Sequence, residues 1–162
     1  MAPSLTELLK RKRRDDTDDY NFPEDVILHV DVKFAAGLDP DNMGPNCERR
    51  TYQVYGSTVT GSEFMTREVY GCPDPKWRRI FSMRHKRATR FLYLEVLRTG
   101  STSDPGTSTG DVCVGRVQIP LPTAANTVTG GRFGLVRLKG SEVVSEGYII
   151  VSVEITNPLI YH

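Results

Sequence analysis

The sequence predicts an all-β fold, an eight-stranded antiparallel β-sandwich spanning residues 26–156. From Val26 onward, eight short runs either alternate apolar with polar residues or concentrate β-branched and aromatic ones. Gly, Pro, Asn, Asp and Ser fill most of the gaps between these runs. No amphipathic stripe of three helical turns follows residue 20, so the pattern favours a sandwich over alternating βα units.

Each run is seven to nine residues long, which suits a single strand. The first alternates apolar and polar positions, the third and fourth flank a Pro-containing turn, and the last is almost continuously apolar. In chain order the runs are VILHVDVKF (26–34), TYQVYGSTV (51–59), FMTREVY (64–70), WRRIFSM (77–83), FLYLEVL (91–97), VCVGRVQI (112–119), RFGLVRL (132–138) and YIIVSVEI (148–155).

The aromatic residues of the fourth and fifth runs are candidates for the core. Trp77 and Phe81 lie four positions apart, on the same face of a strand. We therefore expect both to pack between the two sheets. Ile80, Phe91 and Tyr93 are expected to add to this core.

Residues 25–157 form the predicted sandwich domain, between a charged tail (1–24) and a short C-terminal tail (158–162). The N-terminal segment SLTELLKRKRR fits a short helix capped by Ser4, with Glu7 completing a capping box. One interpretation is a charged lead-in without fixed structure, and the other is a nuclear-localisation or nucleic-acid patch. The bases concerned are Lys10, Arg11, Lys12, Arg13 and Arg14. The one low-complexity segment, residues 99–111, predicts a flexible loop.

Composition limits the class of protein more than it identifies a partner. A chain of 162 residues suits one domain, and a net charge of +1 leaves only local clusters to attract a charged partner. Three widely spaced cysteines show no metal-binding spacing and favour a reduced compartment. No apolar run of 18 residues and no signal-peptide core occur, so we expect a soluble, intracellular protein.

Catalytic motifs are absent from the sequence. There is no GxSxG, no P-loop and no HExxH. His29 and His85 fall in or beside strand-like runs, where His29 is better explained as part of a polar strand face than as a base. The sequence therefore predicts a protein that is not an enzyme and has no cofactor.

The order of the strand motifs resembles that of C2 domains. Six segments are similar to that family's strands, including the Pro-x-Trp-x-x-x-Phe that opens its fourth strand. They are LHVDVKFAAGL (28–38), RTYQV (50–54), PKWRRIF (75–81), LYLEVL (92–97), VGRVQIPL (114–121) and GYIIVSVEI (147–155). The strand order is similar to the type II arrangement, and the size resembles that of small plant C2-domain proteins.

The resemblance implies the fold but not the calcium switch. Calcium-dependent C2 domains collect Asp carboxylates on loops at one end, because calcium takes hard oxygen ligands. Here Asn42 stands at one ligand position, and Arg50 and Arg98 stand where two carboxylates would be. An arginine repels a divalent cation, so no metal site is expected. The carboxylates that remain near these loops are Asp39, Asp41, Asp104 and Asp111.

Positive charge is concentrated in YGCPDPKWRRIFSMRHKRATR, residues 70–90. Such a cluster attracts anionic lipid or the phosphates of nucleic acid, or forms a solvated basic face. The candidate anion contacts are Lys76, Arg78, Arg84, Lys86, Arg87 and Arg90, with Arg50 and Arg98 at the loop end.

The sequence thus predicts a C2-like module that binds anionic membrane lipid or a protein partner without calcium. It would be cytoplasmic and peripheral to the membrane, with nuclear entry a further prediction from Lys10–Arg14. The alternative is a viral capsid or matrix protein, because a basic arm before an eight-stranded sandwich is also the outline of small jelly-roll capsids. The arm has nearly as many acids as bases, so it would neutralise little nucleic acid.

Overall fold

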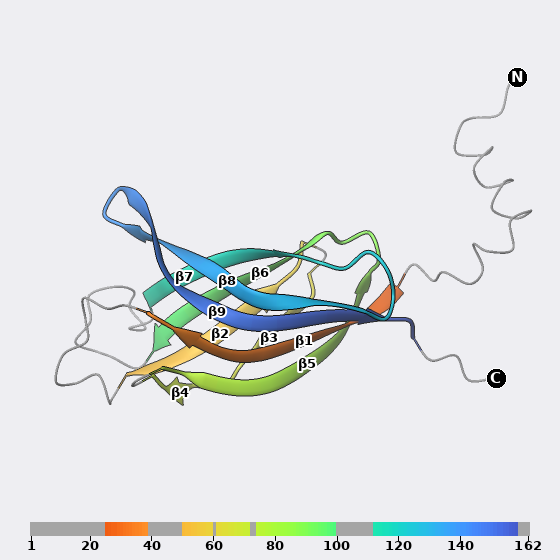
Figure 1. The fold of residues 1–162 in the computed structure, drawn as a ribbon, viewed down its shortest axis with the longest axis horizontal. Coiled ribbons are helices and arrows are strands. Elements are labelled where there is room, and N and C mark those ends of the chain that lie inside the picture. The colour runs from red at the N-terminus through yellow and green to blue at the C-terminus, as the bar shows by residue number, and fades with distance from the viewer. Residues whose placement is uncertain (1–24, 39–49, 60, 72–73, 100–111, 159–162) are drawn as a thin grey trace, which may run out of the picture.

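The computed structural model describes residues 25–38, 50–59, 61–71, 74–99 and 112–158. Within these ranges the chain forms nine strands and no helix, which confirms the all-β class (Figure 1). No membrane-spanning helix is therefore found in the described ranges. The strands are β1 (Asp25–Ala36), β2 (Thr51–Ser57), β3 (Glu63–Met65), β4 (Val69–Tyr70), β5 (Lys76–Lys86), β6 (Phe91–Thr99), β7 (Val112–Pro120), β8 (Thr127–Lys139) and β9 (Glu142–Thr156).

The run predicted as one strand at 64–70 forms two short strands, β3 and β4, and this accounts for the ninth strand. Both pair with β2. Thr66 lies between them and leaves the regular ladder, since its hydroxyl accepts a hydrogen bond from the backbone N–H of Val54 at 2.9 Å. Gln53 also donates to the Thr66 carbonyl at 2.9 Å, and the Thr66 N–H donates to the Val54 carbonyl at 2.9 Å, so side-chain and backbone hydrogen bonds together join this segment to β2.

The strands are joined in the order β3-β2-β6-β7-β8-β9-β1-β5, and every pair is antiparallel. β7 and β8 share only one register pair, Arg116 and Val136. The continuous sheet is therefore weakest between these two strands, and this is where one layer gives way to the other. One layer contains β5, β1, β9 and β8, and the other contains β7, β6 and β2 (Figure 1). This two-layer arrangement confirms the predicted β-sandwich.

The core fills the space between the two layers. Its largest fully buried side chains are leucine and isoleucine residues from five strands, namely Leu28, Leu92, Leu94, Ile119, Leu135, Ile149 and Ile155. Trp77 is 3% exposed, and its indole Nε1 donates to the Tyr52 carbonyl at 3.2 Å. Phe81 packs against the same core, and its ring stacks on Phe64 with centroids 4.5 Å apart. The core role predicted for these two aromatic residues is confirmed.

Three other residues expected in the core lie on the outer surface. Ile80 is 61% exposed because it pairs with Asp31 on the outer face of the β1–β5 ladder. Phe91 and Tyr93 are also exposed, since Leu92 takes the inward position of β6. The prediction that Ile80, Phe91 and Tyr93 add to the core was wrong, because strand periodicity alone does not say which face is buried.

β5 is an edge strand, and its start is irregular. The register shifts between the pairs Val32–Arg79 and Phe34–Lys76, and Arg78 has φ +49°. Such a bulge bends the strand and adds twist. Arg79 shares the inward side with Phe81, but at the sheet edge its guanidinium reaches solvent, 5.5 Å from the Phe81 ring centroid.

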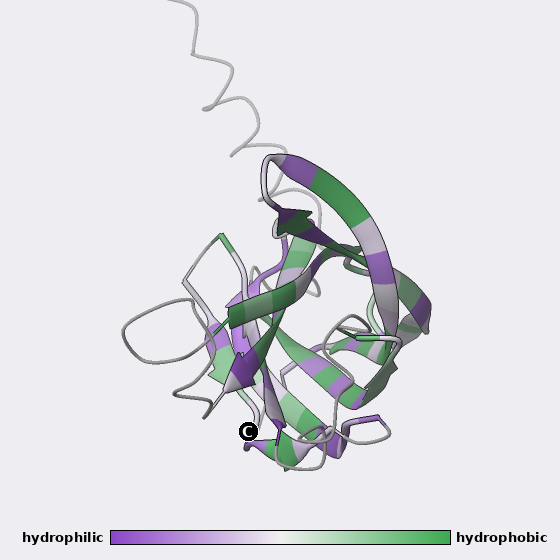
Figure 2. Ribbon diagram, turned by 90° about the vertical axis from the view of Figure 1, so that its left-hand side faces the viewer, coloured by the Kyte–Doolittle hydropathy of each residue, from purple (hydrophilic) through white to green (hydrophobic). Residues whose placement is uncertain are grey.

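The β8–β9 hairpin extends beyond the sandwich, as Figure 1 shows, and Figure 2 shows apolar and polar residues alternating along it. Leu138 and Val143 pair across it and are 65% and 71% exposed. On the opposite face, Arg137 and Lys139 contact Glu146 at 3.2 and 2.5 Å. The apolar face of the hairpin tip is therefore the exposed one.

Candidate functional site

The six basic residues predicted for the β5 region divide into two groups. Lys76 and Arg78 lie at the start of β5. The other four lie at its far end and in the turn to β6, and we call them the corner cluster: Arg84, Lys86, Arg87 and Arg90. Arg84 lies six positions after Arg78 on β5, which corresponds to about 20 Å along the strand. The predicted patch is therefore not one continuous surface.

The corner cluster lies where the sandwich domain begins and ends along the chain. Lys86 pairs with Asp25, the first residue of β1, and Ile27 pairs with Thr156, the last residue of β9. The Arg87 guanidinium donates to the side-chain carbonyl of Asn157 at 2.7 Å. Arg84, Lys86 and Arg90 are exposed, whereas Arg87 is half-buried. Three of the four cations thus face solvent at one corner of the molecule.

Asp25 is a carboxylate that pairs with this cluster. Asp25 lies 2.9 Å from the Lys86 ammonium. Its hydrogen bond to Lys86 holds the pKa of the Asp25 carboxyl below its usual value, so it stays ionised at neutral pH. Among the described residues, this corner therefore combines four cations with one ion-paired carboxylate.

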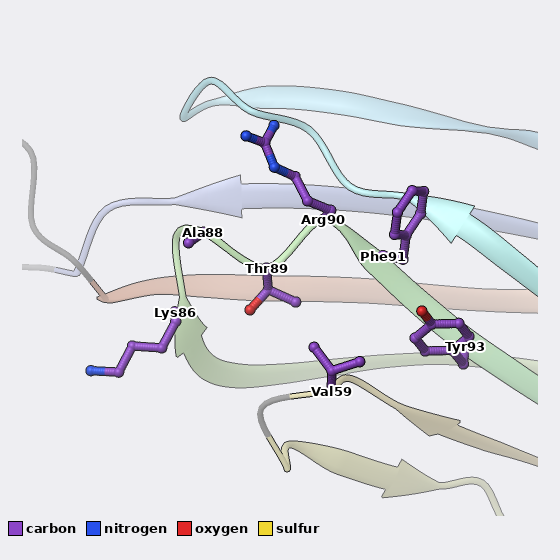
Figure 3. A pocket seen from close by; sticks show the side chains of 7 residues that line it. All are labelled: Val59, Lys86, Ala88, Thr89, Arg90, Phe91 and Tyr93. Atoms are coloured by element: carbon purple, nitrogen blue, oxygen red, sulfur yellow. The ribbon is translucent and has the colours of Figure 1, made fainter.

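A shallow cavity of about 320 Å³ opens beside the corner cluster (Figure 3). Its lining combines two cationic side chains with apolar and aromatic ones, and consists of Val59, Lys86, Ala88, Thr89, Arg90, Phe91 and Tyr93. Lys86 and Arg90 point away from the two rings and in different directions, so their charged ends lie at separate parts of the rim (Figure 3). Sequence reasoning found the two cations but missed the apolar wall, because it assigned Phe91 and Tyr93 to the core.

His85 is buried directly beneath the cluster, at 4% exposure, opposite Val26 of β1. Burial lowers the pKa of the imidazole, and the Val26 backbone and Asp25 oppose this only in part. His85 is therefore neutral at neutral pH and adds no charge to the surface. His29 lies on the outer face of β1, where its ring nitrogens bond to Ser82 and Thr156 at 2.7 and 2.8 Å. This matches the polar strand face predicted for it.

Arg50 and Arg98 lie at the other end of the sandwich from the corner cluster. Arg98 follows Arg90 by eight residues along the chain, and Arg50 directly precedes Thr51, which pairs with Thr99 of β6. Arg98 is 4% exposed, so its side chain is not available as a surface contact. Arg50 is half-buried, and its carbonyl accepts from the backbone N–H of Gly71 at 3.0 Å. Sequence reasoning missed the burial of Arg98, although its place at the end of a β6 run alternating Leu92, Leu94 and Val96 was a signal.

This end of the domain is where the C2 resemblance would place calcium. The described residues do not fit that ion, since Arg50 and Arg98 offer guanidinium groups instead of oxygen ligands. No group of three His, Cys, Asp or Glu residues in the described ranges could hold a metal ion. Some predicted candidates lie outside the described residues: Asp39, Asp41, Asp104, Asp111 and the tail bases Lys10, Arg11, Lys12, Arg13 and Arg14.

Comparison with solved structures gives clear matches to C2 domains. A C2 domain-containing protein matches with a TM-score of 0.56 and 20% identity, over 82% of this chain and 88% of that one. The C2A domain of a plant Extended Synaptotagmin 1 matches with a TM-score of 0.61 and 15% identity, over 83% and 97% of the chains. A human GIVD cytosolic phospholipase A2 matches at 0.60 and 14% identity, over 83% of this chain but only 18% of the enzyme. No family profile and no curated protein matches the sequence.

The chain therefore has the fold of a C2 domain, as the motif order indicated. The jelly-roll capsid, which the sequence left open as an alternative outline, is not the architecture found. At identities of 14–20%, the similarity extends to the fold alone.

Proposed function

We propose that this domain binds the surface of anionic membranes without calcium, through the corner cluster. The observation that carries the proposal is the gathering of four cations at one corner, three of them exposed, with one carboxylate among them. Each Lys or Arg near an anionic membrane surface contributes about 1 kcal/mol. Arg84 and Arg90, which are both exposed, would then contribute about 2 kcal/mol, or roughly thirtyfold in affinity.

The surroundings of the cluster support a membrane rather than a dissolved polyanion. Val59 is 77% exposed beside Lys86 and Arg90, and Phe91 is also exposed. Apolar side chains beside cations match the boundary between lipid head groups and acyl chains. Duplex nucleic acid would use the cations through its phosphates but gives the apolar residues little to contact.

Calcium independence rests on the other end of the domain. Arg50 and Arg98 would repel a divalent cation there. The corner cluster needs no bridging ion, because its own charge is already opposite to that of the lipid. Peripheral attachment in the cytoplasm follows from this proposal, while nuclear entry through Lys10–Arg14 stays a separate prediction.

The test is co-sedimentation with vesicles of phosphatidylcholine alone or mixed with phosphatidylserine, in calcium or in a chelator. The domain should sediment only with the anionic vesicles, equally in both buffers, and RNA should compete weakly. Arg84→Glu, Lys86→Glu and Arg90→Glu together should abolish sedimentation. The matched control, Arg67→Glu, Arg116→Glu and Arg132→Glu, changes the net charge equally at exposed residues elsewhere and should still bind.

Three results would overturn the proposal. Equal loss in both triple variants would mean that net charge, not this corner, drives binding. Binding only in calcium would mean that the loop end holds the ion after all. A preference for RNA over vesicles would instead assign the cluster to nucleic acid.

A further inference from the structure

The cavity beside the corner cluster has a composition that a purely electrostatic contact would not require. Its described lining is mostly apolar, with Val59, Phe91 and Tyr93 as a wall and the stems of Lys86 and Arg90 beside them (Figure 3), and it contains no carboxylate. A volume of about 320 Å³ falls at the small end of the range for small-molecule sites. Polar groups that fix an orientation, set in an apolar wall, are what distinguishes such sites from general surface.

The two turns that form the cavity are held in place by hydrogen bonds. In the β5–β6 turn, the N–H of Thr89 donates to the Lys86 carbonyl at 3.0 Å, and the N–H of Leu121 donates to the Arg90 carbonyl at 2.8 Å. In the β2–β3 turn, the N–H of Thr58 donates to the Ser62 carbonyl at 2.9 Å. The cavity walls are therefore supported by backbone contacts.

The two turns are also tied to each other. The Ser62 hydroxyl donates to the Arg84 carbonyl at 3.1 Å, which links the β2–β3 turn to β5. Val59, carried by the first turn, is thereby held opposite the second. A preformed site loses less free energy on binding than one that must first be ordered.

The acids nearest the cavity point to partners of their own, and the described lining carries cations but no carboxylate, which favours an anion. Glu95, two residues beyond Tyr93, lies 3.7 Å from Arg116, and Glu63 accepts a hydrogen bond from the Tyr55 hydroxyl at 2.5 Å. Asp25 competes for Lys86 from outside the cavity. Removing the Asp25 charge should therefore strengthen binding of an anion there.

We infer that this cavity binds an amphipathic phosphate ester, with its apolar group against Phe91, Tyr93 and Val59 and its phosphate at the rim, within reach of the flexible side chains of Lys86 and Arg90 (Figure 3). The inference rests on the proposed function, because a lipid phosphate is one source of such a ligand. A soluble alkyl phosphate is the other. Inorganic phosphate alone would satisfy the cations but not the wall.

Calorimetric titration of the full chain with hexyl phosphate and with inorganic phosphate tests the idea. Hexyl phosphate should bind at least tenfold more tightly than inorganic phosphate, since several buried methylenes each contribute about 0.8 kcal/mol. Arg90→Gln should weaken hexyl phosphate about tenfold, and Asp25→Asn should strengthen it several-fold, as the loss and gain of one close charge would. Arg67→Gln, an exposed arginine between β3 and β4 and outside the cavity lining, is the matched control and should change neither.

The apolar wall is tested by Val59→Ser with Phe91→Ser, whose folding is checked by the melting curve. This variant should bind both phosphates equally. Equal affinity of the unmodified chain for the two phosphates would overturn the inference, and so would weaker binding by Asp25→Asn. If hexyl phosphate fails to bind while the anionic vesicles still sediment, the proposed function stands and the cavity is not its site. If hexyl phosphate binds and vesicles do not, the ligand is soluble and the membrane proposal fails.

Discussion

Replacing Trp77 by alanine tests the packing of the two layers. The indole is 3% exposed, and its Nε1 bridges from β5 to the Tyr52 carbonyl of β2 at 3.2 Å. Truncating a buried Trp costs about 3–5 kcal/mol. Leaving a buried carbonyl without its donor adds about 1 kcal/mol. The expected loss of about 4–6 kcal/mol is a large part of the 5–15 kcal/mol that stabilises a typical domain.

Thermal and urea unfolding measure this loss. For a domain of this size, each kcal/mol lowers the melting temperature by about 2–4 °C, so Trp77→Ala should lower it by roughly 8–24 °C. Trp77→Phe, which keeps most of the ring volume, should lose less. The contrast is Ile80→Ala, only three positions away but 61% exposed, which should cost about 0.5 kcal/mol or less. Similar losses for Trp77→Ala and Ile80→Ala would refute the register assigned to β5.

Two further predictions concern the backbone and the buried imidazole. Gly147→Ala should destabilise the fold by about 1–3 kcal/mol in urea unfolding, because φ is +76° and a Cβ would lie 2.7 Å from the Ala36 carbonyl oxygen. Gly140→Asn, at φ +64° in open space, should be nearly neutral, and equal costs would contradict the argument. The folded pKa of His85 lies below the unfolded value of 6.5, so on acidification the unfolded chain takes up a proton before the fold does. Stability should therefore fall as pH drops from 7 through 6.5 toward the folded pKa, by up to about 1.4 kcal/mol per pH unit. His85→Leu should remove that slope and His29→Gln should not, and a slope unchanged in His85→Leu would disprove the assignment.

Much of the fold could be predicted because strand periodicity and turn residues are local signals. Alternation in VILHVDVKF marks β1, and Trp77 and Phe81 mark the inward face of β5. The face of FLYLEVL could not be read in the same way, since both of its faces carry large apolar side chains. Only the partner strands decide that Leu92 and Leu94 face inward and that Phe91 and Tyr93 do not.

The candidate site was predictable in part for the same reason. The cations of residues 84–90 are adjacent in sequence, so the corner cluster is visible there. Val59 joins it from a different turn, 27 residues before Lys86. Arg98 shows the opposite case, in which a charged residue adjacent to a loop is buried by its neighbours in three dimensions. Proximity across the fold was the information that the sequence lacked.

The position of Asp25 connects the corner cluster to the N-terminal bases. Asp25 begins β1 and pairs with Lys86, so the chain that carries Lys10–Arg14 joins the domain at this corner. Arg14 precedes Asp25 by 11 residues, which span at most about 36–40 Å when extended. The tail bases can therefore reach any membrane that the corner cluster contacts. Changing all five, Lys10 to Arg14, to glutamine should weaken binding to phosphatidylserine vesicles and flatten its dependence on salt, because fewer screened charges then contribute. Combined with Arg90→Gln, the losses in binding free energy should add, since the two groups contact different lipids of one surface. Unchanged binding and an unchanged salt dependence in the five-residue variant would show that the tail bases do not contact this surface, and would leave nuclear or nucleic-acid recognition as their prediction.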